Sequence, residues 1–210
     1  MSVNTETLLS IITCMQKNIK ENRDYLSNLD REIGDGDHGI NMDRGFDEVI
    51  KKMDSMQNAD VAGILKTTGM TLAFKVGGAS GPLYGTAFMK ASDVVKGKSE
   101  IAIQDLPALL DAAIGGIQLR GKAVAGEKTM LDALMPAREA AEKAVAEGQD
   151  VKSIIEIMVK AAEDGAEYTK TIKATKGRAS YVGERSIGHM DPGAASSVVL
   201  LRSIAEIVLA

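Results

Sequence analysis

The sequence contains no tryptophan and only three phenylalanines and four tyrosines among its 210 residues. Proteins that bind single-stranded nucleic acids stack bases on aromatic side chains, and most nucleic-acid-binding surfaces are basic. Here 25 basic residues are outweighed by 29 acidic ones, which gives a formal net charge of −4. The composition therefore argues against a nucleic-acid partner.

Cysteine and long hydrophobic runs are also scarce. Cys14 is the sole cysteine, so it cannot close an intrachain disulfide, and its place in an apolar helical stripe predicts core packing in a reducing compartment. No run of 18 uncharged apolar residues occurs, and the N-terminal MSVNTETLL has no basic residues ahead of an apolar core. We expect a cytoplasmic protein with no membrane segment.

The sequence does show helical periodicity along most of its length. Apolar residues recur at steps of three, four or seven, as on the buried face of a helix. With 45% hydrophobic residues and no linker or repeat, one domain over residues 1–210 is expected. The pattern predicts eight helices and no convincing strand; the helices cover about residues 4–29, 41–56, 60–76, from 82, 105–120, 129–147, 150–172 and from 191.

The predicted fold class is therefore all-α, with short connections that favour antiparallel neighbours. Asp60 and Asp191 are predicted N-caps, and Pro136 is expected to kink or restart the sixth helix. Four connections combine glycine with polar residues, and they follow the first, third, fifth and seventh helices: 30–41, 77–82, 121–130 and 176–193. If successive helices alternate in direction, these connections lie at one end of the molecule and form a single composite site.

The first of these connections carries a dense acidic cluster, within LDREIGDGDHGINMDRG. Asp30, Asp35 and Asp37 surround glycines that break regular structure. Such carboxylates repel one another unless a cation lies among them, and hard oxygen ligands suit Mg²⁺, which substrate phosphates often complete. The first N–H groups of the following helix can then meet a phosphate. From spacing alone, a solvated acidic turn without chemistry remains the alternative.

Three better-known loops fit less well. The G-x-G-x-x-G spacing of Gly34, Gly36 and Gly39 needs a preceding buried strand, and the aspartates among these glycines would repel a pyrophosphate. An EF-hand that starts at Asp35 fails at three required positions. The run GKAVAGEKT looks like a Walker A loop, but glutamate stands where lysine should follow the second glycine, and no strand precedes it.

Two further connections contain groups that could bind a ligand. GGASGP, residues 77–82, permits close backbone approach, and the Ser80 hydroxyl can donate to a phosphate oxygen. An ordinary glycine-rich helix connection explains this segment equally well. KGRASYVGERSIGHMDP, residues 176–192, is long for a passive connection and contains Arg178, Arg185 and His189.

Together, LDREIGDGDHG, GGASGPLYGT, GEKTMLDAL and KGRASYVGERSIGHMDPGA resemble the ADP-binding L subunits of bacterial dihydroxyacetone kinases, and the resemblance covers the whole chain. The same module forms the nucleotide domain of single-chain, ATP-dependent dihydroxyacetone kinases. The resemblance implies a single-domain antiparallel eight-helix barrel with nucleotide and Mg²⁺ at one end. No dihydroxyacetone-binding domain is expected in this chain, which favours the type that depends on the phosphotransferase system.

In that type, a phosphohistidine on an M subunit phosphorylates ADP on L, and L passes the phosphoryl group to dihydroxyacetone on a K subunit. The resemblance thus implies a phosphotransferase subunit with two protein partners, tightly bound ADP that cycles to ATP, and two Mg²⁺ ions. A fatty acid kinase module shares the acidic loop but is normally followed by lipid-binding sequence. A nucleotide-sensing adaptor that transfers nothing is the non-enzymatic alternative.

The resemblance also implies roles for individual residues. Asp30, Asp35 and Asp37 would hold metal. The implied nucleotide contacts are His38, Gly39, Ile40, Asn41, Ala79, Ser80, Gly121, Met130, Arg178, Asp191, Pro192 and Gly193. Among these contacts, only Arg178 has a fixed charge that could follow the transferred group, so it is the expected catalytic residue. No phosphohistidine is expected on either histidine of this chain.

Overall fold

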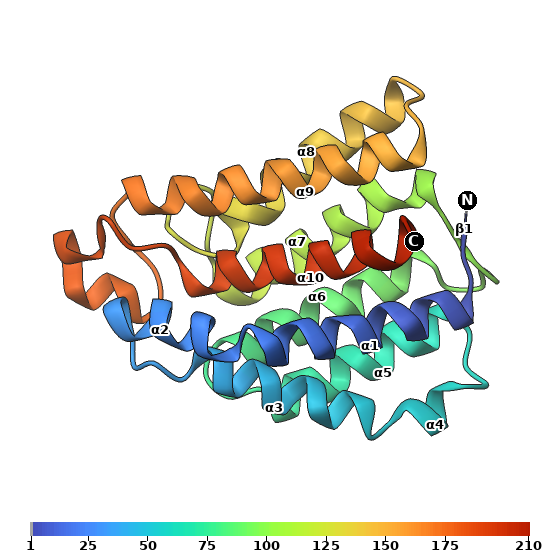
Figure 1. The fold of residues 1–210 in the computed structure, drawn as a ribbon, viewed down its shortest axis with the longest axis horizontal. Coiled ribbons are helices and arrows are strands. Elements are labelled where there is room, and N and C mark those ends of the chain that lie inside the picture. The colour runs from blue at the N-terminus through green and yellow to red at the C-terminus, as the bar shows by residue number, and fades with distance from the viewer. Residues whose placement is uncertain (1) are drawn as a thin grey trace.

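The computed structural model describes residues 2–210, and helices make up most of this part of the chain (Figure 1). The all-α prediction is confirmed. The longer helices are α1 (Thr5–Glu21), α2 (Arg23–Ile33), α3 (His38–Ile50), α5 (Val61–Lys75), α6 (Ser80–Val94), α7 (Leu106–Gly121), α8 (Leu131–Ala146), α9 (Val151–Tyr168) and α10 (Pro192–Val208). Shorter helical segments are α4 (Met53–Met56), η1 (Ile103–Asp105), η2 (Thr169–Thr171) and η3 (Arg178–Ser186).

The first predicted helix is two helices in the structure. α1 ends and α2 begins at Asn22, whose backbone leaves helical geometry at φ −95° and ψ 5°. The Asn22 side chain donates to the Asn18 carbonyl at 2.8 Å, a local bond that competes with helix continuation. Because α2 runs on to Ile33, Asp30 lies in the last turn of a helix and not in the loop after it.

Two other boundaries differ from the prediction. α3 begins at His38, three residues before the expected start near Asn41. A two-stranded antiparallel pair also joins β1 (Ser2–Val3) to β2 (Ile101–Ala102). Strands of two residues are too short to produce a sequence alternation, so the expectation of no strand was wrong at this one place.

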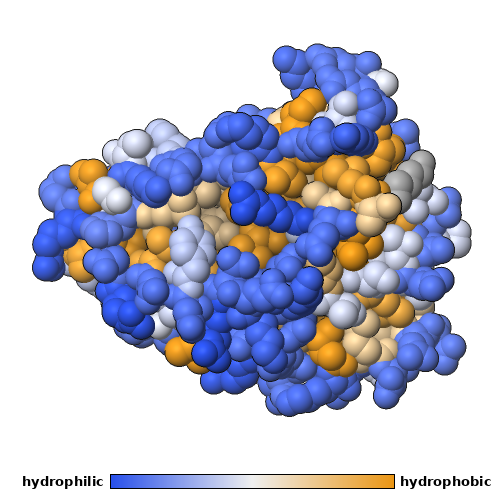
Figure 2. Space-filling view, viewed as in Figure 1, coloured by the Kyte–Doolittle hydropathy of each residue, from blue (hydrophilic) through white to orange (hydrophobic). Residues whose placement is uncertain are grey.

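The helices pack around a shared core in a closed cycle of neighbours. α1 contacts α3 and α10, and the cycle continues through α5, α6, α7, α8 and α9 back to α10. Most of α10 is buried, and apolar side chains from α1, α7, α9 and α10 enclose a cavity of about 200 Å³. Hydrophilic residues cover much of the outer face, with apolar surface between them (Figure 2). Among residues 2–210, no helix is both long and apolar enough to cross a membrane.

A close backbone approach between α8 and α9 lies beside a proline. Pro136 lies inside α8, so the helix does not restart there, and the other expected effect, a kink, stays a prediction. Because proline has no N–H, the carbonyl of Asp132 loses its usual partner four residues on. α9 packs against this carbonyl through Gly165, where an added Cβ would lie 2.0 Å from the Asp132 oxygen. The Asp132 carbonyl of α8, which lacks this hydrogen bond, therefore packs directly against Gly165 of α9, which has no side chain to block the contact.

We predict that Gly165→Ala lowers the free energy of unfolding by about 1–3 kcal/mol, because the new methyl group overpacks the α8–α9 contact. The matched control is Gly115→Ala in α7, where an added Cβ would meet no atom within 4 Å. This control should stabilise the protein by up to about 1 kcal/mol, since alanine favours a helix over glycine. Urea denaturation of both variants measures the difference, and equal effects would contradict the packing argument.

Candidate functional site

The four glycine-containing connections line one cavity of about 690 Å³. Some residues of each connection line the cavity, and they fall within residues 30–41 of the first connection, 77–82 of the second, 121–130 of the third and 175–193 of the fourth. The prediction that these segments gather at one end of the helices is thereby confirmed. Because its lining combines charged side chains, glycines and helix N-termini, the cavity is the candidate functional site.

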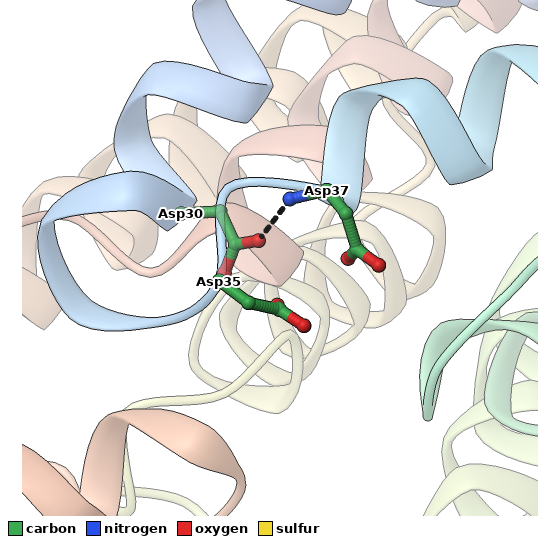
Figure 3. Close-up of side chains that lie close together, drawn as sticks. All are labelled: Asp30, Asp35 and Asp37. Carbon is green, nitrogen blue, oxygen red and sulfur yellow. Dashed lines mark hydrogen bonds between the residues drawn. The ribbon is translucent and has the colours of Figure 1, made fainter.

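Three carboxylates converge at the edge of the cavity (Figure 3). Asp30 comes from the last turn of α2, Asp35 from the α2–α3 turn, and Asp37 from the N-cap position of α3. One oxygen of each lies within 4.8 Å of the chosen oxygens of the other two. Hard oxygen donors at this spacing fit a divalent cation such as Mg²⁺.

The local backbone is shaped so that the carboxylates can approach one another. Asp30 Oδ2 accepts hydrogen bonds from the backbone N–H groups of Asp37 at 2.9 Å and His38 at 3.1 Å, which ties α2 to the first turn of α3. A Cβ at Gly34 would lie 2.1 Å from Asp30 Oδ1, and Gly36 adopts φ +77°. Glycine is therefore required at both positions of the turn.

The electrostatics of the cluster favour a positive ligand. Burial raises the pKa of Asp30 above its usual range, the two backbone N–H groups oppose this, and the charges of Asp35 and Asp37 raise the pKa further. A carboxylate disfavoured by its neighbours gains stability when a cation binds among them. The donor set and its mutual repulsion both fit a metal site.

Arg178 already contacts this cluster. Its Nη2 lies 2.9 Å from Asp35 Oδ2, although most of its side chain is exposed. The segment that carries it, η3, is fixed to α2 by a small apolar cluster of Ile33, Ala174 and Ala179, separate from the main core, with Val182 packed against it. The structure therefore brings the expected catalytic arginine beside the expected metal ligands.

His38 lies in the first turn of α3 and connects two other elements. Its Nδ1 lies 3.1 Å from the Ser80 hydroxyl at the start of α6, and its Nε2 lies 2.9 Å from the Ser196 hydroxyl in α10. Burial lowers the pKa of His38 to about 4, with a smaller opposing effect of Asp37. The imidazole is therefore neutral at physiological pH.

Asp191 is the N-cap of α10, as predicted, and its Oδ2 accepts the Ala194 N–H at 2.7 Å. Burial raises the pKa of this carboxyl to about 7; the Ala194 bond and Lys128 lower the pKa, and Asp132 and Asp30 raise it. Most N-cap carboxyls are solvated. The buried Asp191 carboxyl differs from them because its pKa lies near neutrality.

Lys128 is a cavity residue that the sequence reasoning missed. It is 1% exposed, and its ammonium donates to the backbone carbonyls of Thr169, Ile172 and His189. The backbone at Lys128 has φ +61°, which is unusual for a side chain of this size. The sequence signal that could have found Lys128 was its displaced position in the Walker-like run GKAVAGEKT. In the structure, Lys128 links the connection between α7 and α8 to the connection between α9 and α10.

The structure does not bring every expected residue to the cavity. Gly39 and Ile40 are absent from its lining; a Cβ at Gly39 would lie 1.9 Å from the Arg23 carbonyl, and Ile40 is exposed. Both face away because successive residues in the first turn of α3 point in different directions. His189 and Arg185 are also absent, whereas Arg120 and Lys176 add fixed positive charge that the prediction did not include.

Comparison with known proteins places these features in a family context. The DAK2 domain matches residues 32–206. The ADP-binding subunit DhaL of the PEP-dependent dihydroxyacetone kinase of Escherichia coli (strain K12) is 40% identical over 205 residues, with 98% of each chain covered. The corresponding subunit of kinase 1 from Listeria innocua is 44% identical over 206 residues, with the same coverage.

A solved structure of the dihydroxyacetone kinase from C. freundii, in complex with AMP-PNP and Mg²⁺, matches with a TM-score of 0.76. The match covers 98% of this chain and 34% of that one at 22% identity, and it shows a likeness of fold. Human triokinase/FMN cyclase is 34% identical over 186 residues, which cover 88% of this chain and 32% of that protein.

The pKa of Asp191 generates a pH prediction for stability. Because its folded-state pKa of about 7 exceeds the ordinary value of 3.8, the folded state binds a proton that the unfolded state has lost, and stability falls as pH rises through this window. Asp191→Asn keeps the cap and removes the titration. Relative to the original chain, this variant should gain about 4 kcal/mol of unfolding free energy between pH 4 and pH 7.5.

The control is Asp150→Asn, at the exposed N-cap of α9, where the Ser153 N–H lowers the pKa of the carboxyl. The folded-state pKa of Asp150 lies below 3.8, so this carboxyl is already largely ionised at pH 4. The stability of the control variant relative to the original chain should therefore stay nearly constant over the same pH range. Urea denaturation in metal-free buffer at several pH values measures both trends. Parallel pH curves for Asp191→Asn and the original chain would contradict the buried-carboxyl argument.

Proposed function

The chain belongs to the DAK2 domain family, and we propose that it is the ADP-binding subunit of a PEP-dependent dihydroxyacetone kinase. The observation that carries this proposal is that four connections far apart in the sequence line one cavity and bring a three-carboxylate cluster beside an arginine. Phosphoryl transfer depends mostly on positioning and on stabilisation of charge, and this arrangement supplies both. Relatives that match along their whole length carry the same name.

The proposal extends to the architecture. Residues 1–210 form one nucleotide-binding domain, an antiparallel eight-helix barrel with the nucleotide and metal site at one end. The closed cycle of helix contacts and the common position of the four connections support this description.

ADP with two Mg²⁺ ions would stay bound to this subunit, accept a phosphoryl group from a phosphohistidine on an M subunit, and supply it to dihydroxyacetone on a K subunit. Asp30, Asp35 and Asp37 would hold the metal. The nucleotide would contact His38, Asn41, Ala79, Ser80, Gly121, Met130, Arg178, Asp191, Pro192 and Gly193, which all line the cavity, with the first-turn backbone of Gly39 and Ile40 beside it.

In this proposal Arg178 is the catalytic residue. Its guanidinium pairs with Asp35, its side chain is 68% exposed, and it lines the cavity, so a phosphoryl group held there would lie within its reach. Planar guanidinium groups bind phosphoryl oxygens with two parallel donors, and their charge does not titrate. Arg120 and Lys176 add background positive charge, but neither pairs with the carboxylate cluster among the described residues.

A nucleotide-sensing adaptor would use the same cavity without transferring a group. The proposal is tested by mixing the protein with phosphorylated M subunit, K subunit and dihydroxyacetone. Formation of dihydroxyacetone phosphate that depends on this chain supports a kinase subunit, whereas bound ADP without product supports an adaptor.

We predict that Arg178→Ala retains ADP but slows single-turnover transfer to dihydroxyacetone by on the order of 10³-fold, as positioned arginines do in other phosphotransferases. Lost stabilisation of the transition state lowers rate more than ground-state binding. Arg185→Ala, in the same segment but outside the cavity lining, is the matched control and should transfer at the original rate. A change of less than about twofold for Arg178→Ala would exclude this role.

We also predict that the purified protein carries near-stoichiometric ADP in Mg²⁺ buffer and that Asp37→Asn loses it. The remaining carboxylates would repel a diphosphate that no metal screens. The control is Asp24→Asn, which removes the same charge from a side chain that is 85% exposed in the first turn of α2, away from the cavity. Nucleotide released by denaturation is quantified in each sample. Equal ADP content in the two variants would contradict the metal assignment.

A further inference from the structure

A continuous chain of hydrogen-bonding groups runs from Tyr84 through His38 to the Ser80 hydroxyl at the cavity. Tyr84 of α6 lies 2.7 Å from the Ser196 hydroxyl and 2.9 Å from the Ser197 hydroxyl, both in α10. Ser196 lies 2.9 Å from His38 Nε2, and His38 Nδ1 lies 3.1 Å from the Ser80 hydroxyl. This chain therefore connects the interior of the helix bundle to a hydroxyl that lines the cavity.

The position of these groups makes their hydrogen bonds obligatory. Ser196 is 0% exposed, Ser197 1%, Tyr84 3% and His38 7%, so water reaches these polar atoms poorly. Buried hydroxyl and ring N–H groups need acceptors, because an unpaired one costs its desolvation energy. Ser80 differs from the others, since it is only half-buried and opens onto the cavity.

The Gly193 carbonyl lies within hydrogen-bond distance of the Tyr84 hydroxyl at 3.0 Å and the Ser196 hydroxyl at 3.1 Å, so the protons near it can be placed in several ways. At His38 these placements reduce to two, one for each tautomer, and one arrangement of each kind is followed here. Tyr84, Ser196, Ser197 and Ser80 each have one hydroxyl proton, and neutral His38 has one N–H. In both arrangements Ser197 donates to the Gly193 carbonyl, which lies 2.9 Å away. The arrangements differ in the direction of donation along the rest of the chain.

In the first arrangement, Tyr84 donates to Ser196, Ser196 donates to His38 Nε2, and Nδ1–H donates to Ser80. The proton of Ser80 then points into the cavity as a donor. In the second arrangement, Ser80 donates to Nδ1, Nε2–H donates to Ser196, and Ser196 donates to Tyr84, which donates to Ser197. Ser80 then presents only lone pairs to the cavity. Every buried group is satisfied in both cases, so a ligand at Ser80 decides between them.

We propose that Tyr84 and Ser196 are positioning residues that act through the His38 tautomer to set Ser80 as a hydrogen-bond donor to an anionic oxygen in the cavity. This inference deepens the proposed function and rests on it, because the anion would be a phosphate oxygen of ADP. Phosphate oxygens accept hydrogen bonds and would be repelled by the lone pairs of the second arrangement. Anion binding selects the first arrangement, and Ser196 stabilises it by donating to Nε2.

The tautomer is directly observable. The chain has two histidines, so ¹⁵N-histidine labelling gives two sets of ring signals, and His189→Asn identifies those of His38. With ADP and Mg²⁺ bound, Nδ1 should be protonated and Nε2 unprotonated. A protonated Nε2 with an unprotonated Nδ1 in that complex would overturn the proposal.

A double-mutant cycle tests whether Ser196 acts on ligand binding through Ser80. The measured quantity is the affinity for ADP·Mg²⁺, determined by calorimetry. Ser196→Ala should weaken binding by about three- to tenfold, which is the range for one neutral hydrogen bond. In a Ser80→Ala background the same change should alter affinity by less than about twofold, since its effect passes through the hydroxyl already removed. Equal fold-changes in the two backgrounds would overturn the proposal.

The control is Ser203→Ala, also in α10 and 0% exposed, whose hydroxyl donates to the Val199 carbonyl and has no contact with His38. It carries the same loss of a buried hydroxyl and should leave ADP affinity unchanged. If Ser196→Ala does not fold, Tyr84→Phe replaces it in the cycle with the same expectation. Absence of ADP binding in the original protein would overturn the proposed function itself, whereas additive effects in a protein that binds ADP overturn only this inference.

Discussion

Mutual repulsion among Asp30, Asp35 and Asp37 is the constraint on which the structure of this end depends. The carboxylates are held within a few ångströms by a turn in which a Cβ at Gly34 would collide with Asp30. The structure offsets the repulsion with two backbone N–H groups and with Arg178. A cation that binds here is attracted to all three carboxylates and offsets their repulsion, so the cluster is most stable when it is occupied.

That constraint explains why one site needs four distant connections. A carboxylate cluster alone attracts cations, but a diphosphate also needs donors that no acidic residue can supply. The N-terminus of α6 and Asp191 at the N-terminus of α10 face the cavity from other sides, and helix N-termini carry partial positive charge. Alternating helices bring these opposite charges to one end of the molecule.

The sequence predicted what depends on local chemistry. Apolar periodicity located the helices, aspartates located their N-termini, and an acidic run among glycines located the candidate metal site. It could not predict the break at Asn22, because asparagine tolerates a helix interior and its bond to the Asn18 carbonyl is one of several local options. Nor could it show that Lys128 is buried, since its three carbonyl partners lie 41 to 61 residues away in sequence. Contacts of that range arise only after the bundle has formed.

The segment that carries Arg178 is attached to the molecule by polar contacts at its ends and by an apolar cluster of its own. Lys128 pins the backbone at Thr169, Ile172 and His189, while the stretch between them rests on its own apolar cluster around Ile33 and Ala179. Opening this stretch breaks its apolar contacts, its bonds to Glu127 and the Arg178–Asp35 ion pair, but it leaves the main core intact. Its local opening free energy therefore lies below that of global unfolding. Substitutions in this small apolar cluster can therefore change how readily the segment opens while the packing of the long helices stays the same.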